Sequence, residues 1–207
     1  MLTTIVTSFW MCLPIAPLNP IEQDTLPAMA LQVSAGVTSP NHIVSTGPEL
    51  SLKYELLATH PLVLRTSLDY QFGSTRTTLW PGGTLHQASI ELTAFYYRGT
   101  DKLTGYIGAG PVFRFGYYNL SSTAKDSLWA EDQIDEVSLK QALGYRIFLG
   151  MRFSKVYVLE VGVSEVESDI VYHRRPASNV EATYGESTKL SAFRITFGYL
   201  WTLKEFW

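Results

Sequence analysis

The chain has 207 residues, of which 46% are hydrophobic, 17% charged and 13% aromatic. This length suits a single domain, and the 16 Lys and Arg against 19 Asp and Glu give no support to nucleic-acid binding. The single cysteine, Cys12, excludes an internal disulfide framework and a cysteine-cluster metal site. No stretch reaches the roughly 20 apolar residues that a membrane-spanning helix needs.

The N-terminal segment, residues 1–29, is predicted to be a signal peptide or remnant of one. Residues 2–18 are mostly apolar or small, but the run is too short and too interrupted by proline to span a membrane as a helix. Ala28-Met29-Ala30 supplies the small-x-small pattern of a cleavage site, although Lys53 is the first basic residue. The alternative is a disordered leader, or a start of the chain that is assigned at the wrong residue.

From about residue 30 onward, apolar residues recur with period two, which is typical of strands with two chemically different faces. Residues 62–73 show it most clearly, since Leu, Thr, Tyr and Phe alternate there with Val, Arg, Ser, Asp, Gln and Gly. None of these stretches has the i, i+3, i+4 spacing of a helix, so the chain is predicted to be all-β. About eight strands are expected, at 30–38, 48–58, 62–73, 85–97, 103–118, 137–153, 156–167 and 192–203.

The lengths of the strands and of their connections favour a membrane barrel. Most runs last about 10–16 residues, whereas strands of soluble proteins cluster near 5–6 and tilted membrane strands need about 9–11. Short connections at 59–61, 98–102 and 154–155 alternate with long polar ones at 39–47, 74–84, 119–136 and 167–187. This alternation predicts a closed eight-stranded antiparallel up-and-down transmembrane β-barrel over residues 30–207, with four long extracellular loops.

The two faces of the strands indicate which one meets lipid. The apolar faces carry many bulky aromatics that would overfill an eight-stranded interior, whereas the opposite faces combine glycine with a few charges of both signs. We therefore predict a hydrogen-bonded interior ion network, the alternative being a solvated face. Its members are Lys53, Glu55, Arg65, Asp69, Glu91, Arg114, Lys140, Arg146, Arg152, Glu160 and Arg194.

Aromatic residues gather near both ends of the predicted strands, with Leu, Val and Ile between them. Two such bands are typical of the girdles that mark the membrane interfaces. One band is predicted near the long loops, at Tyr70, Phe72, Phe115 and Tyr117, and the other near the short turns, at Tyr96, Phe153, Tyr157, Tyr199 and Trp201.

On this architecture the chain resembles the small eight-stranded outer-membrane barrels of Gram-negative bacteria, the porin-like group that includes outer-membrane protein X and the transmembrane domain of outer-membrane protein A. The resemblance implies a C-terminal signal read by the barrel-assembly machinery, and residues 196–203 look like it. The signal would use Gly198, Tyr199, Trp201, Leu203 and Trp207, although the chain runs on past Leu203 and Glu205 breaks the alternation.

Some barrels of this family are enzymes, namely lipid A deacylases and palmitoyl transferases, so the histidines are candidate catalytic groups. His42 and His60 are predicted in connections, and His86 at the aqueous rim of a lipid-facing strand. His173 has Ser178, Asn179 and Glu181 nearby, but not in the His-x-Ser-Asn order of the deacylases. The acidic residues Glu131, Asp132, Asp135 and Glu136 lack the spacing of a calcium loop.

We therefore predict no catalytic residues, no metal and no cofactor. The expected function is a non-enzymatic integral outer-membrane scaffold whose loops, with Trp80, Trp129 and Tyr184, touch lipopolysaccharide, another protein or a host ligand. The alternatives are a lipid-modifying enzyme of the deacylase type, a soluble lipocalin-like barrel that holds an apolar ligand, and a small pore. An interior packed with Arg, Glu and Lys argues against the pore.

Overall fold

The computed structural model describes residues 29–40, 46–59, 61–74, 82–100, 102–126, 134–174 and 182–204. The strands are β1 (Met29–Pro40), β2 (Gly47–Thr59), β3 (Leu62–Ser74), β4 (Gly83–Gly99), β5 (Leu103–Leu120), β6 (Ile134–Phe153), β7 (Tyr157–Arg174), β8 (Ala182–Lys189) and β9 (Ala192–Lys204). The predicted leader lies outside the described residues, apart from Met29 at the start of β1. None of the helical residues described is part of a helix long and apolar enough to cross a membrane.

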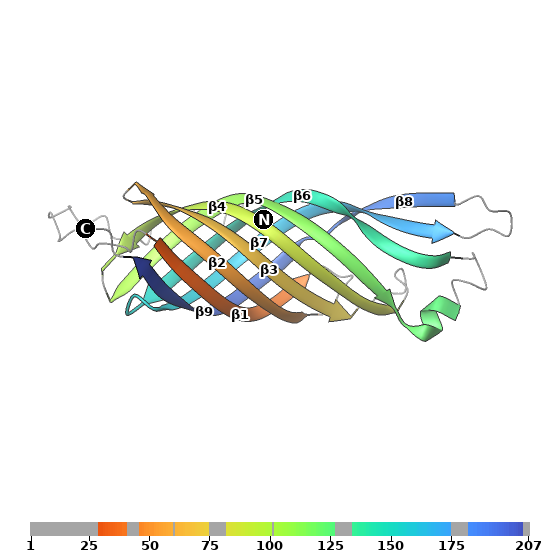
Figure 1. The fold of residues 1–207 in the computed structure, drawn as a ribbon, viewed down its shortest axis with the longest axis horizontal. Helices are drawn as coiled ribbons and strands as arrows, with labels where there is room; N and C mark the ends of the chain where they lie inside the picture. Colours follow the sequence, from red (N-terminus) through yellow and green to blue (C-terminus); the bar gives the residue numbers. More distant parts are fainter. Residues whose placement is uncertain are drawn as a thin grey trace, which may run out of the picture.

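The strands form a closed antiparallel barrel (Figure 1). From β1 to β8 each strand pairs with the next in sequence, and the barrel closes where β9 pairs with both β1 and β7. β8 pairs with the outer part of β7 and continues the line of β9 beyond an interruption at Leu190 and Ser191. β8 and β9 therefore act as one barrel strand, which confirms the predicted eight-stranded up-and-down fold.

The register of the strands sets the width of the barrel. Following cross-strand partners once around the barrel leaves β1 at Met29 and returns to it ten residues later at Ser39, through Leu56, Leu64, Ala94, Ala109, Ile147, Val163 and Phe193. Eight strands with this shift tilt by about 40° and have a backbone radius of about 8 Å. An interior of that size is filled by side chains.

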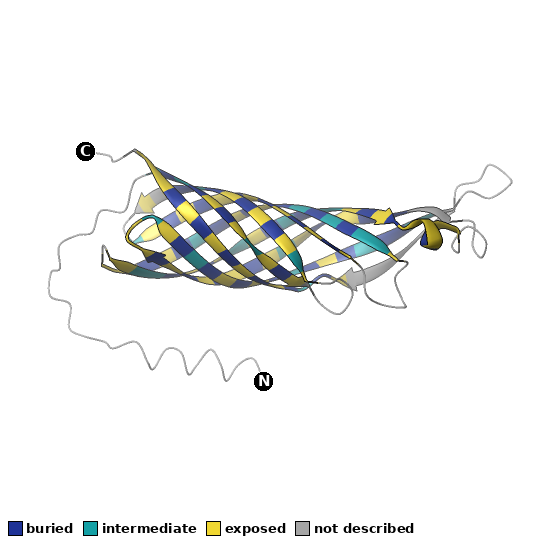
Figure 2. Ribbon diagram, turned by 90° about the horizontal axis from the view of Figure 1, so that it is seen from below, coloured by how far each residue is buried: buried dark blue, intermediate teal, exposed yellow. Residues whose placement is uncertain are grey.

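Exposed and buried residues alternate along the strands (Figure 2). The exposed set contains large apolar side chains such as Leu143 (69% exposed) and Leu50 (60%), whereas Arg146, Arg194 and Lys53 are among the largest fully buried side chains. A water-soluble barrel would have the opposite arrangement. The membrane orientation of the faces is therefore as predicted, and the lipocalin-like alternative is contradicted.

The strands reach further at one end of the barrel than was predicted. The extended strands are β5, β6 and β7, which have 18, 20 and 18 residues against 12 in β1, and their extra length lies at the long-loop end. β6, β7 and β8 project furthest (Figure 1). The predicted loop 167–187 is largely strand, because β7 continues to Arg174 and pairs with β8. These residues alternate without a fully apolar face, so the sequence pattern did not identify them as strands.

The turn between β6 and β7 consists of Ser154, Lys155 and Val156, and the Val156 N–H donates to the Phe153 carbonyl. Ser154 and Lys155 have φ values of 51° and 63°, the left-handed values that the two central residues of a type I′ turn require. Neither residue is glycine, so the turn holds two side chains in a conformation that costs about 1–2 kcal/mol per residue.

Candidate functional site

The interior of the barrel has three layers. Apolar and aromatic side chains fill the short-turn end, and we call them the short-turn plug: Ala30, Val63, Phe95, Tyr97, Tyr106, Phe148, Val158 and Leu200. A second apolar group, the long-loop cluster, fills the other end: Leu85, Tyr118, Leu120, Ala124, Val137, Leu139, Ile170 and Leu190. The charged residues lie between these two layers.

Glu55 and Glu160 are the carboxylates of the charged layer nearer the short-turn plug. The guanidinium of Arg65 donates to Glu55 at 2.7 and 3.0 Å and to Glu160 at 2.8 Å. Arg152 donates to the second oxygen of Glu55, and Lys53 donates to Glu160. Each carboxylate therefore has at least two buried cations, which satisfies the need for paired charges in a dry interior.

Arg146 and Arg194 organise the half of the charged layer nearer the long loops. Both converge on Glu91, at 2.5 Å from Arg146 Nη1 and 2.9 Å from Arg194 Nη1. Arg194 also lies 3.4 Å from Glu49 and 3.6 Å from Asp69. Arg146 Nη2 lies 3.9 Å from Glu160, which joins the two halves into one network.

Arg114 is buried as predicted but stands apart from the carboxylates. It donates to the backbone carbonyl of Leu190 at 3.1 Å and to Ser164 Oγ at 3.1 Å. Among the described residues, no carboxylate oxygen lies within salt-bridge distance of it. Arg114 therefore stands at the boundary between the ion network and the long-loop cluster, to which Leu190 belongs.

The prediction that Lys140 faces the interior is wrong. Its side chain is 62% exposed on the outer wall and pairs with Asp169 at 3.1 Å. The cause is a register shift between Leu139 and Gly144, where β6 carries an irregularity against β7. An extra residue in one strand reverses the alternation beyond it, so Leu139 turns inward and Lys140 outward.

Sequence reasoning missed two parts of the interior. Glu49 is buried and belongs to the network, and its alternation with Lys53 and Glu55 along β2 was the available signal. The short-turn plug was also missed, and the available signal was Phe148, which breaks the apolar alternation of its strand. Here the Arg65 guanidinium carbon lies 4.6 Å from the Phe95 ring centre and 5.1 Å from that of Phe148, close enough for cation–π attraction.

Two glycines make room for the plug. A Cβ at Gly150 would lie 2.1 Å from Cζ of Tyr106, its cross-strand partner, and a Cβ at Gly108 would lie 2.5 Å from Cζ of Phe148. The glycines that indicated the interior face in the sequence therefore allow aromatic rings to pack directly on the backbone. The plug and the network together leave the interior occupied by side chains.

The predicted girdle residues lie on the outer wall at the two ends. At the short-turn end, Tyr199 is 4.8 Å from Trp201 and 5.7 Å from Tyr157 between ring centres. At the long-loop end, Tyr70, Phe72 and Tyr117 are exposed, while Phe115 is half-buried. The remaining two, Tyr96 and Phe153, are exposed near the short turns.

The residues of the predicted assembly signal occupy both faces of β9. Tyr199, Trp201 and Leu203 are exposed on the outer wall, while Gly198 faces Ser34 across the closing pair with β1. Trp207 lies outside the described residues.

The described histidines lie on the outer wall. His86 contacts aromatic girdle residues, and His173 Nε2 is 3.0 Å from Ser138 Oγ. His42, His60 and the side chains of Ser178, Asn179 and Glu181 lie outside the described residues, as does the predicted acidic loop apart from the backbone of residues 135 and 136. In the part of the chain that is described, no group of three or more His, Cys, Asp or Glu is arranged to hold a metal ion.

Comparison with solved structures shows which known fold this barrel resembles. OprG of Pseudomonas aeruginosa superimposes with a TM-score of 0.60 at 15% identity, over 85% of this chain and 97% of that protein. The fold is that of the small outer-membrane barrels. AlkL, solved in lipid bilayers, gives 0.56 at 9% identity over 93% and 100% of the two chains, and Neisserial surface protein A gives 0.53 at 12% over 85% and 97%. No protein-family model and no curated protein sequence matches the chain.

Proposed function

We propose that this small outer-membrane barrel is a non-enzymatic integral protein that acts through its surface at the long-loop end. The observation that carries the proposal is the filled interior, in which the ion network lies between the short-turn plug and the long-loop cluster. An eight-stranded barrel filled in this way offers no water-filled path for solutes. What remains available to partners is the outer wall and the extracellular end.

The long-loop end is built to present a stable surface. β5, β6 and β7 continue beyond the apolar belt, and the long-loop cluster packs their inner faces together. Ala124, in a helical turn at residues 122–126, packs into this cluster. Burial of this kind stabilises a projecting sheet that would otherwise have little reason to stay ordered, and it supports a role in recognising another protein, a host ligand or lipopolysaccharide.

Site-specific labelling of intact bacteria tests the proposed orientation. In a Cys12→Ser background, Lys125→Cys is exposed at the long-loop end and Lys102→Cys is exposed at the short-turn end. A membrane-impermeant maleimide should label Lys125→Cys in intact cells and Lys102→Cys only after the outer membrane is opened. The reverse pattern would contradict the proposal, and protease cleavage within 119–136 or 167–187 on intact cells provides a second measurement.

The exposed residues of β9 support recognition by the barrel-assembly machinery. Tyr199, Trp201 and Leu203 form the apolar outer face of the last strand, in the spacing of the C-terminal signal of such barrels. Replacing Tyr199 and Trp201 by Ser should lower the amount of folded barrel in the outer membrane without preventing folding of the purified chain in detergent. Equal losses in both assays would indicate a stability effect instead.

A second candidate function, serine hydrolysis, is favoured by one contact. The Ser138–His173 hydrogen bond joins a nucleophile to a base, and Glu136 is opposite His173 in the strand register. His173 would take the Ser138 proton during attack on an ester and return it to the departing alcohol, and water would then release the acyl group. A fluorophosphonate probe that labels the wild-type chain but not Ser138→Ala would favour this candidate; no labelling would remove it.

A further inference from the structure

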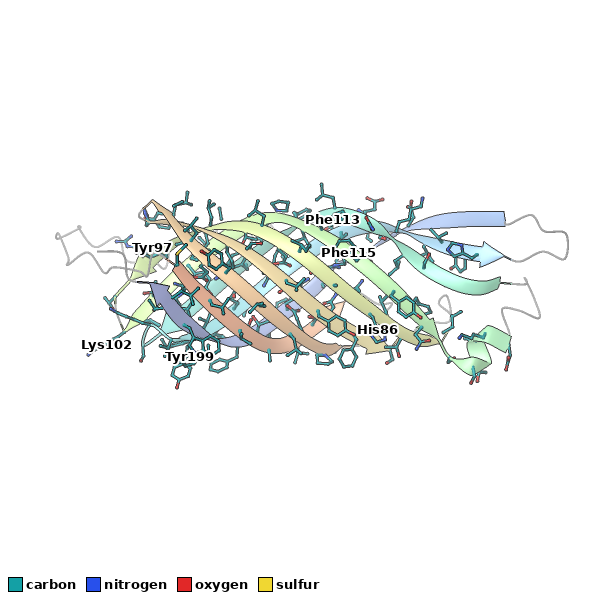
Figure 3. The ribbon with its side chains drawn as sticks, in the orientation of Figure 1. His86, Tyr97, Lys102, Phe113, Phe115 and Tyr199 are labelled. Carbon is teal, nitrogen blue, oxygen red and sulfur yellow. The ribbon has the colours of Figure 1, made fainter. Side chains whose placement is uncertain are left out.

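The outer wall carries a row of three rings across β3, β4 and β5. Phe72 is the cross-strand partner of His86, and His86 is the partner of Tyr117. The His86 ring centre lies 6.1 Å from Phe72, 6.2 Å from Tyr117 and 6.3 Å from Tyr70. Figure 3 shows His86 on the outside of the barrel toward the long-loop end, whereas Tyr199 lies toward the opposite end.

The adjacent row contains a small residue between two rings. Ala88 is the cross-strand partner of both Tyr70 and Phe115. It is also two residues from His86 along β4, so it lies on the same face. We call the five rings around Ala88 the His86 platform: Tyr70, Phe72, His86, Phe115 and Tyr117. Ala88 adds only a methyl group between these rings, and Tyr70, Phe72 and Tyr117 are 42%, 43% and 61% exposed.

His86 brings a polar ring nitrogen to this face. Its Nδ1 and the Tyr70 hydroxyl lie 2.8 Å apart, and among the described residues Nε2 has no hydrogen-bond partner. Whichever tautomer the ring adopts, Nε2 is then a donor or an acceptor that faces the lipid side. Hydrocarbon cannot satisfy such a group, and leaving it unpaired there costs several kcal/mol. The atom therefore needs polar headgroups beside it.

The tilt of the strands places His86 at the level of the headgroups. Leu62 and Phe72 are outward-facing residues ten positions apart on β3, which corresponds to about 25 Å along the barrel axis and to the height of the apolar band of such barrels. A line across tilted strands climbs by about 3 Å per strand. His86 therefore lies just above the top of the band, and Tyr117 lies higher still.

The chemistry of the platform suits an uncharged ring that has an apolar face and hydroxyl groups at its rim. None of its members is an acid, a lysine or an arginine, whereas the outer wall of β6 and β7 carries the Lys140–Asp169 pair and Glu165 beside Lys189. Stacked rings, a free imidazole nitrogen and the Tyr117 hydroxyl fit a sugar ring, whose C–H face packs on the negative face of an aromatic ring. Its hydroxyls can bond to the imidazole and the phenol.

We propose that the His86 platform binds a sugar ring in the headgroup of an outer-leaflet glycolipid. The ring lies over Ala88 and against His86 and Tyr117, while Tyr70 and Phe72 extend alongside the acyl chains below it. The inference deepens the proposed function and rests on its orientation, since that places the platform in the outer leaflet.

The test uses the full chain in nanodiscs of dimyristoylphosphatidylcholine with increasing lipid A. The readout is the NMR resonance of the His86 imidazole, identified by its loss in His86→Phe. We expect a saturable shift with lipid A and none with dimyristoylphosphatidylglycerol, which has charge but no sugar. Tyr117→Leu should raise the half-saturating lipid A concentration about three- to tenfold, the effect of one aromatic contact.

Ala88→Leu separates sugar binding from general packing, because it fills the space between the rings and removes none of them. It should abolish the saturable shift. Tyr157→Leu is the matched control, since Tyr157 also contacts two rings, Phe197 and Tyr199, but at the short-turn end. It should leave the shift unchanged. Heat-modifiable migration on a gel verifies that each variant is folded.

An equal shift with phosphatidylglycerol, or a shift that Ala88→Leu and Tyr117→Leu leave intact, would overturn the inference. This outcome differs from failure of the proposed function. The nanodisc titration is read without regard to orientation in the cell, whereas the cysteine labelling reports orientation alone. A glycolipid-independent shift with correctly oriented labelling would therefore overturn only the sugar site.

Discussion

Replacing Glu160 by Gln should destabilise the barrel more than removal of any exposed charge. Glu160 accepts hydrogen bonds from Lys53 and, at 2.8 Å, from Arg65, and all three side chains are at most 2% exposed. Lys53 has no other carboxylate partner among the described residues. Breaking a buried pair on one side typically costs 3–5 kcal/mol, because the remaining charge stays buried, and we expect about that loss here.

The measurement is urea unfolding in detergent micelles, followed by tryptophan fluorescence, with the free energy of unfolding extrapolated to zero urea. Asp169→Asn is the matched control. It removes the same kind of carboxylate from Lys140, but that pair is 62% and 42% exposed on the outer wall. Solvent screening limits such a pair to about 1 kcal/mol or less. The difference between the two losses in unfolding free energy reports the effect of burial, because both variants remove a carboxylate from a lysine.

A double-mutant cycle completes the argument. Lys53→Met should cost less than Glu160→Gln, because Glu160 keeps Arg65 as a partner. The double variant should then be less destabilised than the sum of the two single variants by at least about 1.5 kcal/mol. The reasoning is refuted if Glu160→Gln costs no more than Asp169→Asn, or if the two single effects simply add.

Three further predictions follow from the packing. The wild-type chain should show no porin-sized conductance steps in planar bilayers, and regular large steps would contradict the filled interior. Gly36→Val should prevent formation of the heat-modifiable barrel on gels, because a Cβ at Gly36 would lie 2.1 Å from the Ile195 carbonyl oxygen. Normal folding of this variant would show that the pairing of β1 with β9 can shift to make room. Lys155→Gly should raise the free energy of unfolding by about 1 kcal/mol in urea titrations, since φ there is 63°, and a loss of stability would show that its side chain matters more than the backbone.

The alternation of apolar and polar residues was a reliable guide wherever one face meets lipid. On β3, each residue from Leu62 to Ser74 alternates between exposed and buried, as the sequence pattern predicts. The pattern lost its value beyond the apolar belt, because both faces of β7 near Asp169 carry polar residues. The prediction for Lys140 was wrong for a related reason. Beyond the irregularity in β6 the inward residues Val137 and Leu139 are themselves apolar, so the change of face does not show in the apolar pattern.

The sequence by itself determined the fold class and, along the strands whose outer face is apolar, which face turns inward, because side-chain direction in a strand is local and repeats every two residues. Only the closed barrel decided which inward residues meet. Arg65 and Glu160 lie 95 positions apart, and they pair because the ten-residue shift around the barrel brings β3 and β7 across the same interior level. The short-turn plug and the His86 platform likewise depend on the register between neighbouring strands. Pairing between distant parts of the chain sets this register, so the pattern within one strand does not reveal it.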